Sequence, residues 1–198
     1  MSSDTLDLRY WRFFLAIEAD LIVLSRYVQI AMDNRSTYSI ELARILLSAC
    51  SEVDVISKLL CQQIDPEQRA GKITEYQRVI LGRFPHLTSM EVLIPRHELA
   101  LRPWKQWETA SPPWWQNYQD VKHTRHEHFP KANLDNTLHA VAGLLCLELY
   151  LYGNADGFNR ANLDPWTQLF TIERPPPRLV VATSRPHYGL PDDPDPDS

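Results

Sequence analysis

The segment from Leu134 to Tyr152 constrains the fold more than any other part of the chain, because it is the most apolar stretch with helical spacing. Apolar residues recur along it at intervals of three and four, which places them on one face of an α-helix. That stripe consists of Leu134, Leu138, Val141, Leu145 and Leu149. Further apolar residues lie on the other sides of the same helix, so we expect it to be central, with the rest of the chain packed around it.

Two earlier segments have the same periodicity and predict a helical hairpin. The first helix is expected within Leu6 to Met32 and is ended by Asp33-Asn34-Arg35. The second begins after Thr37 or Ser39, whose hydroxyl groups can cap free backbone amides. Its apolar stripe consists of Leu42, Ile45, Ala49, Val53, Ile56 and Leu60.

A shorter helix and an irregular insertion follow the hairpin. The helix is expected from about Ile73 to Leu81, stopped by Gly82 and Pro85. Further on, short apolar runs are bounded by prolines, a pattern typical of extended segments or a small edge hairpin. We interpret the stretch at about 82–112 as an insertion into a helical domain.

These elements predict a mainly α protein with a four-helix-type up-and-down bundle. A chain of 198 residues that is 44% hydrophobic and 23% charged suits one domain, which we place at residues 1–172. The tail, residues 173–198, is rich in proline and aspartate and cannot bury much apolar surface. We therefore expect it to be extended or disordered.

Composition narrows the class of function. A net charge of −5 gives no overall attraction to nucleic acid, so RNA binding would need a local basic patch. The three cysteines have no CxxC spacing, and their odd number argues against a disulfide framework and favours a reducing cytoplasm. The longest apolar stretch, Ala140 to Tyr152, carries Glu148 and is too short to span a bilayer, so we expect a soluble protein without a membrane partner.

The residues suited to phosphate binding or proton transfer are concentrated on one predicted helix, Trp114 to Phe129. This helix starts after Pro112 and is broken at Pro130. Its polar side chains include an amide, two basic residues and three histidines: Asn117, Lys122, His123, Arg125, His126 and His128. Because residues three or four apart share a helical face, Lys122, Arg125 and His126 can converge on one phosphate. Asn117 and His123 reach the same side only if the helix bends or begins late.

The helical hairpin, the irregular insertion, and a Trp-rich start to the cluster of Asn117, Lys122-His123 and Arg125 resemble HEPN-type helical-bundle proteins of bacteria. The resemblance spans roughly Leu6 to Tyr152. It implies a bundle that commonly dimerises through the site face. In active members, it implies metal-independent RNA cleavage by a histidine preceded a few residues earlier by an arginine. Such members often act in toxin–antitoxin or antiphage defence systems.

This chain departs from that pattern in the order of the basic residues. The positions four to six residues before His123 hold Asn117, Tyr118 and Gln119, and Arg125 follows His123. Only Lys122 could replace the arginine ahead of a later histidine. The departure leaves ribonuclease activity open.

Metal-free RNA cleavage needs a group that takes the proton from the 2′ hydroxyl, a cation at the phosphate, and a donor for the leaving oxygen. A histidine titrates near neutral pH and suits these proton transfers. We therefore expect His123 to act as the acid or base, Arg125 and Lys122 to hold phosphate, and Asn117 to orient the substrate.

Three further residues are candidates for substrate binding or positioning. His126 lies on the site helix, and Arg26 lies in the middle of the first predicted helix. Glu52, on the second helix, could hold Arg125 or His123 by a charge-assisted hydrogen bond. The simpler interpretation of Glu52 is an exposed helical carboxylate.

Other interpretations stay open at this point. His123, His126 and His128 have ligand chemistry that zinc accepts, but no HExxH pattern or cysteine partner is present, so we expect no metal and no other cofactor. The alternative function is a noncatalytic helical module that binds a partner protein or a nucleotide, and we expect a homodimer in either case. The exposed-looking aromatics could stack on bases, but such residues more often cover a bundle end or a dimer contact: Trp104, Trp107, Trp114 and Trp115. A simpler interpretation makes Lys122, His123 and Arg125 a solvated polar face and makes Trp114, Trp115 and Phe129 core anchors.

Overall fold

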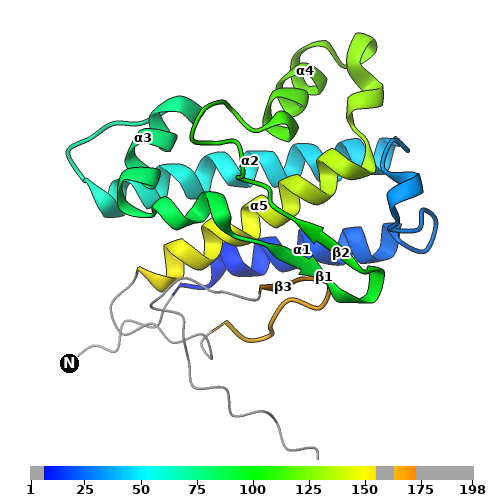
Figure 1. Ribbon diagram of the computed structural model, residues 1–198, viewed down its shortest axis with the longest axis horizontal. Helices are drawn as coiled ribbons and strands as arrows, with labels where there is room; N and C mark the ends of the chain where they lie inside the picture. Colours follow the sequence, from blue (N-terminus) through cyan, green and yellow to red (C-terminus); the bar gives the residue numbers. More distant parts are fainter. Residues whose placement is uncertain (1–6, 155–162, 173–198) are drawn as a thin grey trace, which may run out of the picture.

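The computed structural model describes residues 7–154 and 163–172 (Figure 1). Within these residues the chain is mainly helical, with five α-helices and one small three-stranded sheet. The prediction of a mainly α protein is confirmed. The predicted tail, residues 173–198, lies outside the described residues.

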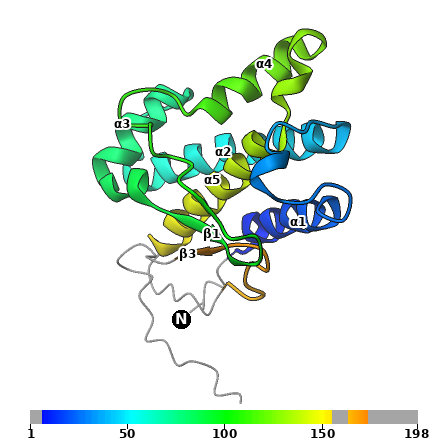
Figure 2. The same cartoon turned by 45° about the vertical axis from the view of Figure 1, so that its right-hand side comes forward.

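The core is built on the contact between α2 (Ile40–Ile64) and α5 (Leu134–Gly153), the most extensive helix pair in the described chain. Helix α1 (Arg9–Leu24) packs against both of them (Figures 1 and 2). Every residue of α5 except Asp135 and His139 is buried. This confirms the central position expected for the most apolar helix.

Local capping explains where α2 begins. The hydroxyl of Ser39 accepts a hydrogen bond from the backbone N–H of Leu42 at 3.1 Å. Such a bond satisfies one of the free amides in the first helical turn. Ser39, one of the two caps predicted from the sequence, is therefore the N-cap.

The prediction for the first helix was too long. Helix α1 ends at Leu24, whose carbonyl accepts hydrogen bonds from the backbone N–H groups of both Tyr27 and Val28. The hydroxyl of Ser25 donates to the carbonyl of Ile22 at 2.7 Å. These local bonds compete with continued helix and form a turn. Arg26 consequently lies in an exposed turn, not in the middle of a helix.

The short helix before the insertion is α3 (Ile73–Arg83), and the insertion contains a hairpin of β1 (Val92–Ile94) and β2 (Leu99–Leu101). Both agree with the sequence prediction. Between the strands Glu98 adopts a left-handed conformation with φ of 53°. The sheet gains a third strand, β3 (Thr171–Ile172), which pairs antiparallel with β1 and was not predicted.

The four exposed-looking tryptophans are all buried, which corrects their expected exposure and agrees with the interpretation of Trp114 and Trp115 as core anchors. The indole N–H of Trp104 donates to the carbonyl of Gly143 on α5 at 3.1 Å. The indole N–H of Trp114 donates to the carbonyl of Pro103 at 2.8 Å. These bonds and the ring contacts among Trp104, Trp107, Trp114 and Trp115 fasten the insertion and the start of the fourth helix to α5.

In the described part of the chain, no helix has the length and apolar character needed to cross a membrane. Cys50, Cys61 and Cys146 are buried free thiols.

Candidate functional site

The predicted site helix is α4 (Pro113–His128), and it is kinked before its end. Thr124 has non-helical dihedral angles, φ −135° and ψ 50°, and its hydroxyl donates to the carbonyl of Asp120 at 3.1 Å. Lys131 pairs with the Asp120 carboxylate at 2.5 Å, and this hydrogen bond holds the pKa of Asp120 below its usual value. The helix therefore bends, but the bend does not bring Asn117 or His123 to the side of Lys122 and Arg125.

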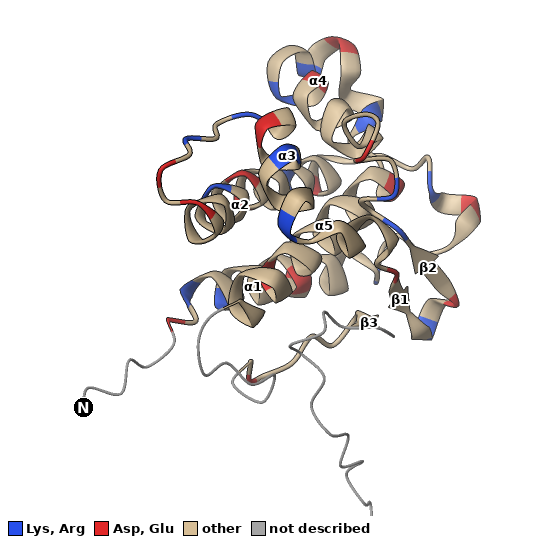
Figure 3. Ribbon diagram, turned by 60° about the vertical axis from the view of Figure 1, so that its left-hand side comes forward, with Lys and Arg blue, Asp and Glu red and all other residues tan. Residues whose placement is uncertain are grey.

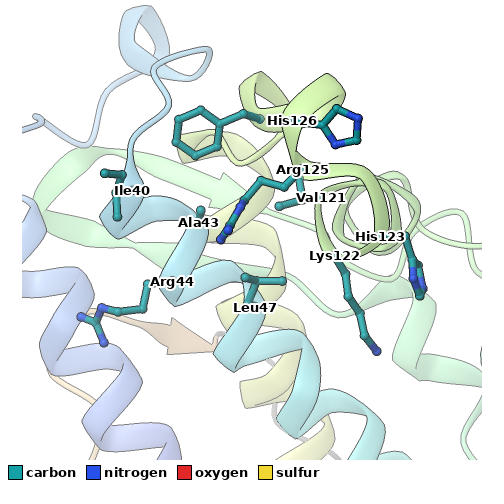
Figure 4. A pocket seen from close by; sticks show the side chains of 10 residues that line it. Ile40, Ala43, Arg44, Leu47, Val121, Lys122, His123, Arg125 and His126 are labelled. Carbon is teal, nitrogen blue, oxygen red and sulfur yellow. The ribbon is translucent and has the colours of Figure 1, made fainter.

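A groove of about 1050 Å³ runs between the first half of α2 and the second half of α4 (Figure 4). Half of its lining residues are apolar and half are basic. The apolar ones are Ile40, Ala43, Leu47, Val121 and Phe129. The basic ones are Arg44, Lys122, His123, Arg125 and His126, and no carboxylate belongs to this lining in the described chain.

The groove has a local basic character that the whole molecule lacks. Acidic and basic residues occur together on α1, α2, α3 and α4 (Figure 3), and the net charge of the chain is −5. On α4, Lys122 and Arg125 lie at the groove beside α2. A local patch of this kind is what anion binding by an acidic protein requires.

The basic side chains do not all point the same way. In Figure 4, Arg125 extends from α4 toward Ala43, and Lys122 projects beside the groove. His123 lies on the other side of α4, and the ring of His126 points away from α2. All four side chains are exposed. The structure therefore brings Lys122 and Arg125 to one groove without bringing His123 and Arg125 face to face.

The cations of the groove differ in how far their charge is already neutralised. Arg44 pairs with Asp20 at 2.9 Å and with Glu41 at 2.8 Å, and these carboxylates raise its pKa. Lys122 instead lies 5.5 Å from the ring centroid of Tyr118. Burial raises the pKa of the Tyr118 hydroxyl, partly offset by Lys122. Lys122 and Arg125 are thus the permanent cations most available to a ligand.

Two other predicted site residues lie outside the groove. The Asn117 amide donates to the side-chain oxygen of Asn136 on α5 at 3.2 Å. Asn136 in turn donates to the carbonyl of Lys131 at 2.8 Å. Asn117 therefore faces α5, and Arg26, in the turn after α1, does not line the groove either.

Glu52 lies beside a carboxyl group that sequence reasoning did not single out as a functional candidate. Its neighbour is Glu148 of α5, which is wholly buried and has no hydrogen-bond partner among the described residues. Burial, and secondarily the charge of Glu52, raise the pKa of Glu148 well above its usual value. Burial also raises the pKa of Glu52. In the described chain, no hydrogen bond or ion pair joins Glu52 to Arg125 or His123.

Within residues 7–154 and 163–172, no group of three or more His, Cys, Asp or Glu side chains is placed to hold a metal ion. The three histidines of α4 thus do not form such a group.

Comparison of the chain with protein-family models, with curated proteins and with solved structures finds no match. The resemblance to HEPN-type proteins therefore rests on the residues of this chain alone.

Proposed function

We propose that this protein is a HEPN-like RNA-binding protein whose ligand lies in the groove between α2 and α4. The observation that carries the proposal is the pairing of available cations, Lys122 and Arg125, with an apolar groove surface. Lysine and arginine bind phosphates, which supply much of the affinity for nucleic acid. Apolar and aromatic surface, here including Phe129, suits the faces of unpaired bases.

In this proposal the long helices α1, α2, α4 and α5 form a HEPN-like four-helix bundle. The protein acts as a homodimer in the cytoplasm, within a toxin–antitoxin or antiphage defence system. The buried α2–α5 pair with α1 and α4 on its flanks supports the bundle. The exposed groove surface supports an assembly through the face of the site.

Metal-independent cleavage of the bound RNA is an extension of the same proposal. His123 would transfer the protons and Arg125 would stabilise the phosphate. Both side chains line the groove, but in Figure 4 they point to different sides of α4. Cleavage in this proposal therefore pairs Arg125 of one copy with His123 of a second copy, and binding is the activity that a single chain supports better.

The second candidate is a noncatalytic module that binds a partner protein. Exposed apolar side chains near the α2 end of the groove favour it: Ile40 is 76% exposed and Tyr38 is 49% exposed. Tyr38 packs edge-on against Phe129 at 5.5 Å between ring centroids, so this apolar surface continues into the groove.

Fluorescence anisotropy with labelled single-stranded and duplex RNA, in excess chelator and at several salt concentrations, tests the first candidate. We expect Arg125→Gln with Lys122→Gln to weaken RNA binding at least tenfold and to lower the salt dependence by about one unit per lost phosphate contact. The control is Arg96→Gln, an exposed arginine on the β1–β2 connection that does not line the groove.

Equal binding by wild type and the double variant would reject the groove as the RNA site. Gel electrophoresis of the RNA from the same samples tests whether the protein cleaves it. Cleavage that is lost in His123→Ala supports this extension of the proposal, and intact RNA with retained binding leaves the protein as a binder.

A further inference from the structure

A second pocket, of about 210 Å³, lies on the α5 side of the start of α4, away from the groove. The loop after β2, the first residues of α4 and the first two turns of α5 form its walls. Its lining includes four groups with charge or proton-transfer capacity: Arg102, Lys105, Asp135 and His139. Asp135 and His139 are also the only two residues of α5 that are not buried.

The ring of His139 is held at one nitrogen. Its Nδ1 lies 2.9 Å from the backbone carbonyl of Asp135 and 3.5 Å from the Asp135 carboxylate. Both neighbours are hydrogen-bond acceptors, so Nδ1 carries the proton. The second nitrogen, Nε2, is therefore the one left to meet a ligand.

Asp135 is held by a backbone hydrogen bond, and its carboxylate lies beside a cation. Its carboxylate lies 3.3 Å from Nε of Arg35, and its backbone N–H donates to the carbonyl of Arg35 at 3.1 Å. Burial works against its ionisation, but His139 and Arg35 together hold the pKa of Asp135 below its usual value. Arg35 thus compensates the one carboxylate of the pocket, and Asp135 orients His139.

The opposite wall supplies positive charge on a rigid loop. Arg102 pairs with Glu91 at 3.0 Å, whereas Lys105 has no ion pair in the described part of the chain. Trp104, between these two residues, is buried and hydrogen-bonded to Gly143 of α5. The backbone that carries Lys105 is therefore anchored to the same helix as His139, which preorganises the two groups.

We propose that this pocket binds a small ligand through a phosphate group, with Lys105 and His139 as the groups that contact it. Lys105 contributes an uncompensated charge, and His139 presents Nε2 to the phosphate oxygens as its free hydrogen-bonding edge. The volume is below the roughly 300 Å³ at which pockets for drug-sized ligands begin. Free phosphate and the phosphate group of a small phosphoester both fit this chemistry. The site uses none of the groove residues and does not depend on the proposed RNA binding.

The test is an NMR titration of the full chain, following the ring signals of the histidines, with the His139 signal assigned by its loss in His139→Gln. The probes are inorganic phosphate, glycerol phosphate and acetate at constant ionic strength. We expect a saturable shift of the His139 signal with a phosphate probe and at least tenfold weaker binding in Lys105→Gln. Lys72→Gln, an exposed lysine before α3, should bind as wild type does.

Tighter binding of glycerol phosphate than of inorganic phosphate assigns the site to phosphoesters, and the reverse assigns it to free phosphate. The proposal is overturned if the His139 signal shifts no more than that of the exposed His86, if acetate binds as tightly as phosphate, or if Lys105→Gln binds unchanged. Lys105→Gln should bind RNA as wild type does, so failure of the phosphate proposal can be told apart from failure of the RNA-binding proposal.

Discussion

Glu148 of α5 is wholly buried and lies close enough to Glu52 of α2 for the charge of Glu52 to raise its pKa. Neither carboxylate oxygen of Glu148 has a hydrogen-bond partner among the described residues. An unpaired carboxylate in a protein core is costly, and the group takes up a proton instead. The central helix pair therefore contains a carboxyl group whose protonated form is favoured by folding.

This arrangement predicts a stability that falls as the pH rises. The pKa of Glu148 is higher in the folded than in the unfolded chain, so folding takes up a proton. The resulting stability is complete below the unfolded value, near 4.5, and is lost as the pH rises toward the folded value. The slope reaches up to about 1.4 kcal/mol per pH unit for one proton.

Urea denaturation between pH 5 and 9 measures this effect. We expect Glu148→Gln to flatten the decline and to be more stable than wild type at the alkaline end. Glu67→Gln changes an exposed carboxylate and should keep the wild-type slope. Equal slopes in wild type and Glu148→Gln would show that Glu148 does not titrate in this way.

Two glycine substitutions should change stability in opposite directions, because a side chain at Gly143 would meet a tryptophan ring and one at Gly82 would meet nothing. A Cβ on Gly143 would lie 3.1 Å from Cζ2 of Trp114, a ring that is fixed by its bond to Pro103. We expect Gly143→Ala to destabilise the fold by about 1–3 kcal/mol through overpacking. Gly82 lies within α3 with open space around its Cβ position, so Gly82→Ala should stabilise by about 0.5–1 kcal/mol. Thermal unfolding measures the stability of both variants. If Gly143→Ala is as stable as wild type, the ring of Trp114 can move to make room for the added methyl group.

Hydrogen bonds to Glu18 attach the segment at residues 163–172 to α1. The buried carboxylate of Glu18 accepts hydrogen bonds from the hydroxyl of Thr167 and from the backbone N–H groups of Gln168 at 3.1 Å and Leu169 at 3.0 Å. Removing it leaves these donors unpaired inside the protein. We expect Glu18→Ala to cost about 3 kcal/mol of unfolding free energy in urea.

Limited proteolysis locates the effect of Glu18→Ala. Cleavage should appear first near residues 163–172, while Glu67→Ala stays resistant. A variant as stable as wild type would show that β3 and the neighbouring backbone hold the segment without Glu18.

The elements predicted well from sequence are those whose signals are local. The stripe of α5 and the Ser39 cap of α2 depend on residues within a few positions of one another. The partners of the tryptophans could not be predicted, because residues such as Gly143, the partner of Trp104, are far away in the sequence. The strand β3 was missed because two residues carry no periodicity, and its partner β1 lies in the distant insertion.

The candidate site was predictable to the same extent. Lys122 and Arg125 are three positions apart and both line the groove, as their spacing predicts, although the kink at Thr124 lies between them. Asn117 precedes Lys122 by five positions, which places it about 140° around the helix, and it faces α5. The α2 side of the groove, with Ala43 and Leu47, could not be predicted, because the packing of α2 against α4 is a tertiary contact.

The exposed end of the groove predicts the oligomeric state. Ile40 is 76% exposed at the first position of α2 and lines the groove, so a homodimer through this face would bury it. A charge introduced there would be buried without a partner. We expect wild type to sediment as a dimer and Ile40→Glu to weaken dimerisation at least tenfold, measured by analytical ultracentrifugation over a concentration series.

The matched control is Phe13→Glu. Phe13 is a half-exposed apolar residue on α1 that does not line the groove. This variant should dimerise as wild type does, because its side chain would lie outside the interface. If wild type is a monomer, or if Phe13→Glu dissociates the dimer and Ile40→Glu does not, the groove face is not the dimer contact. Cleavage by His123 and Arg125 of two copies would then lose its structural basis, while RNA binding by Lys122 and Arg125 of a single chain would stand.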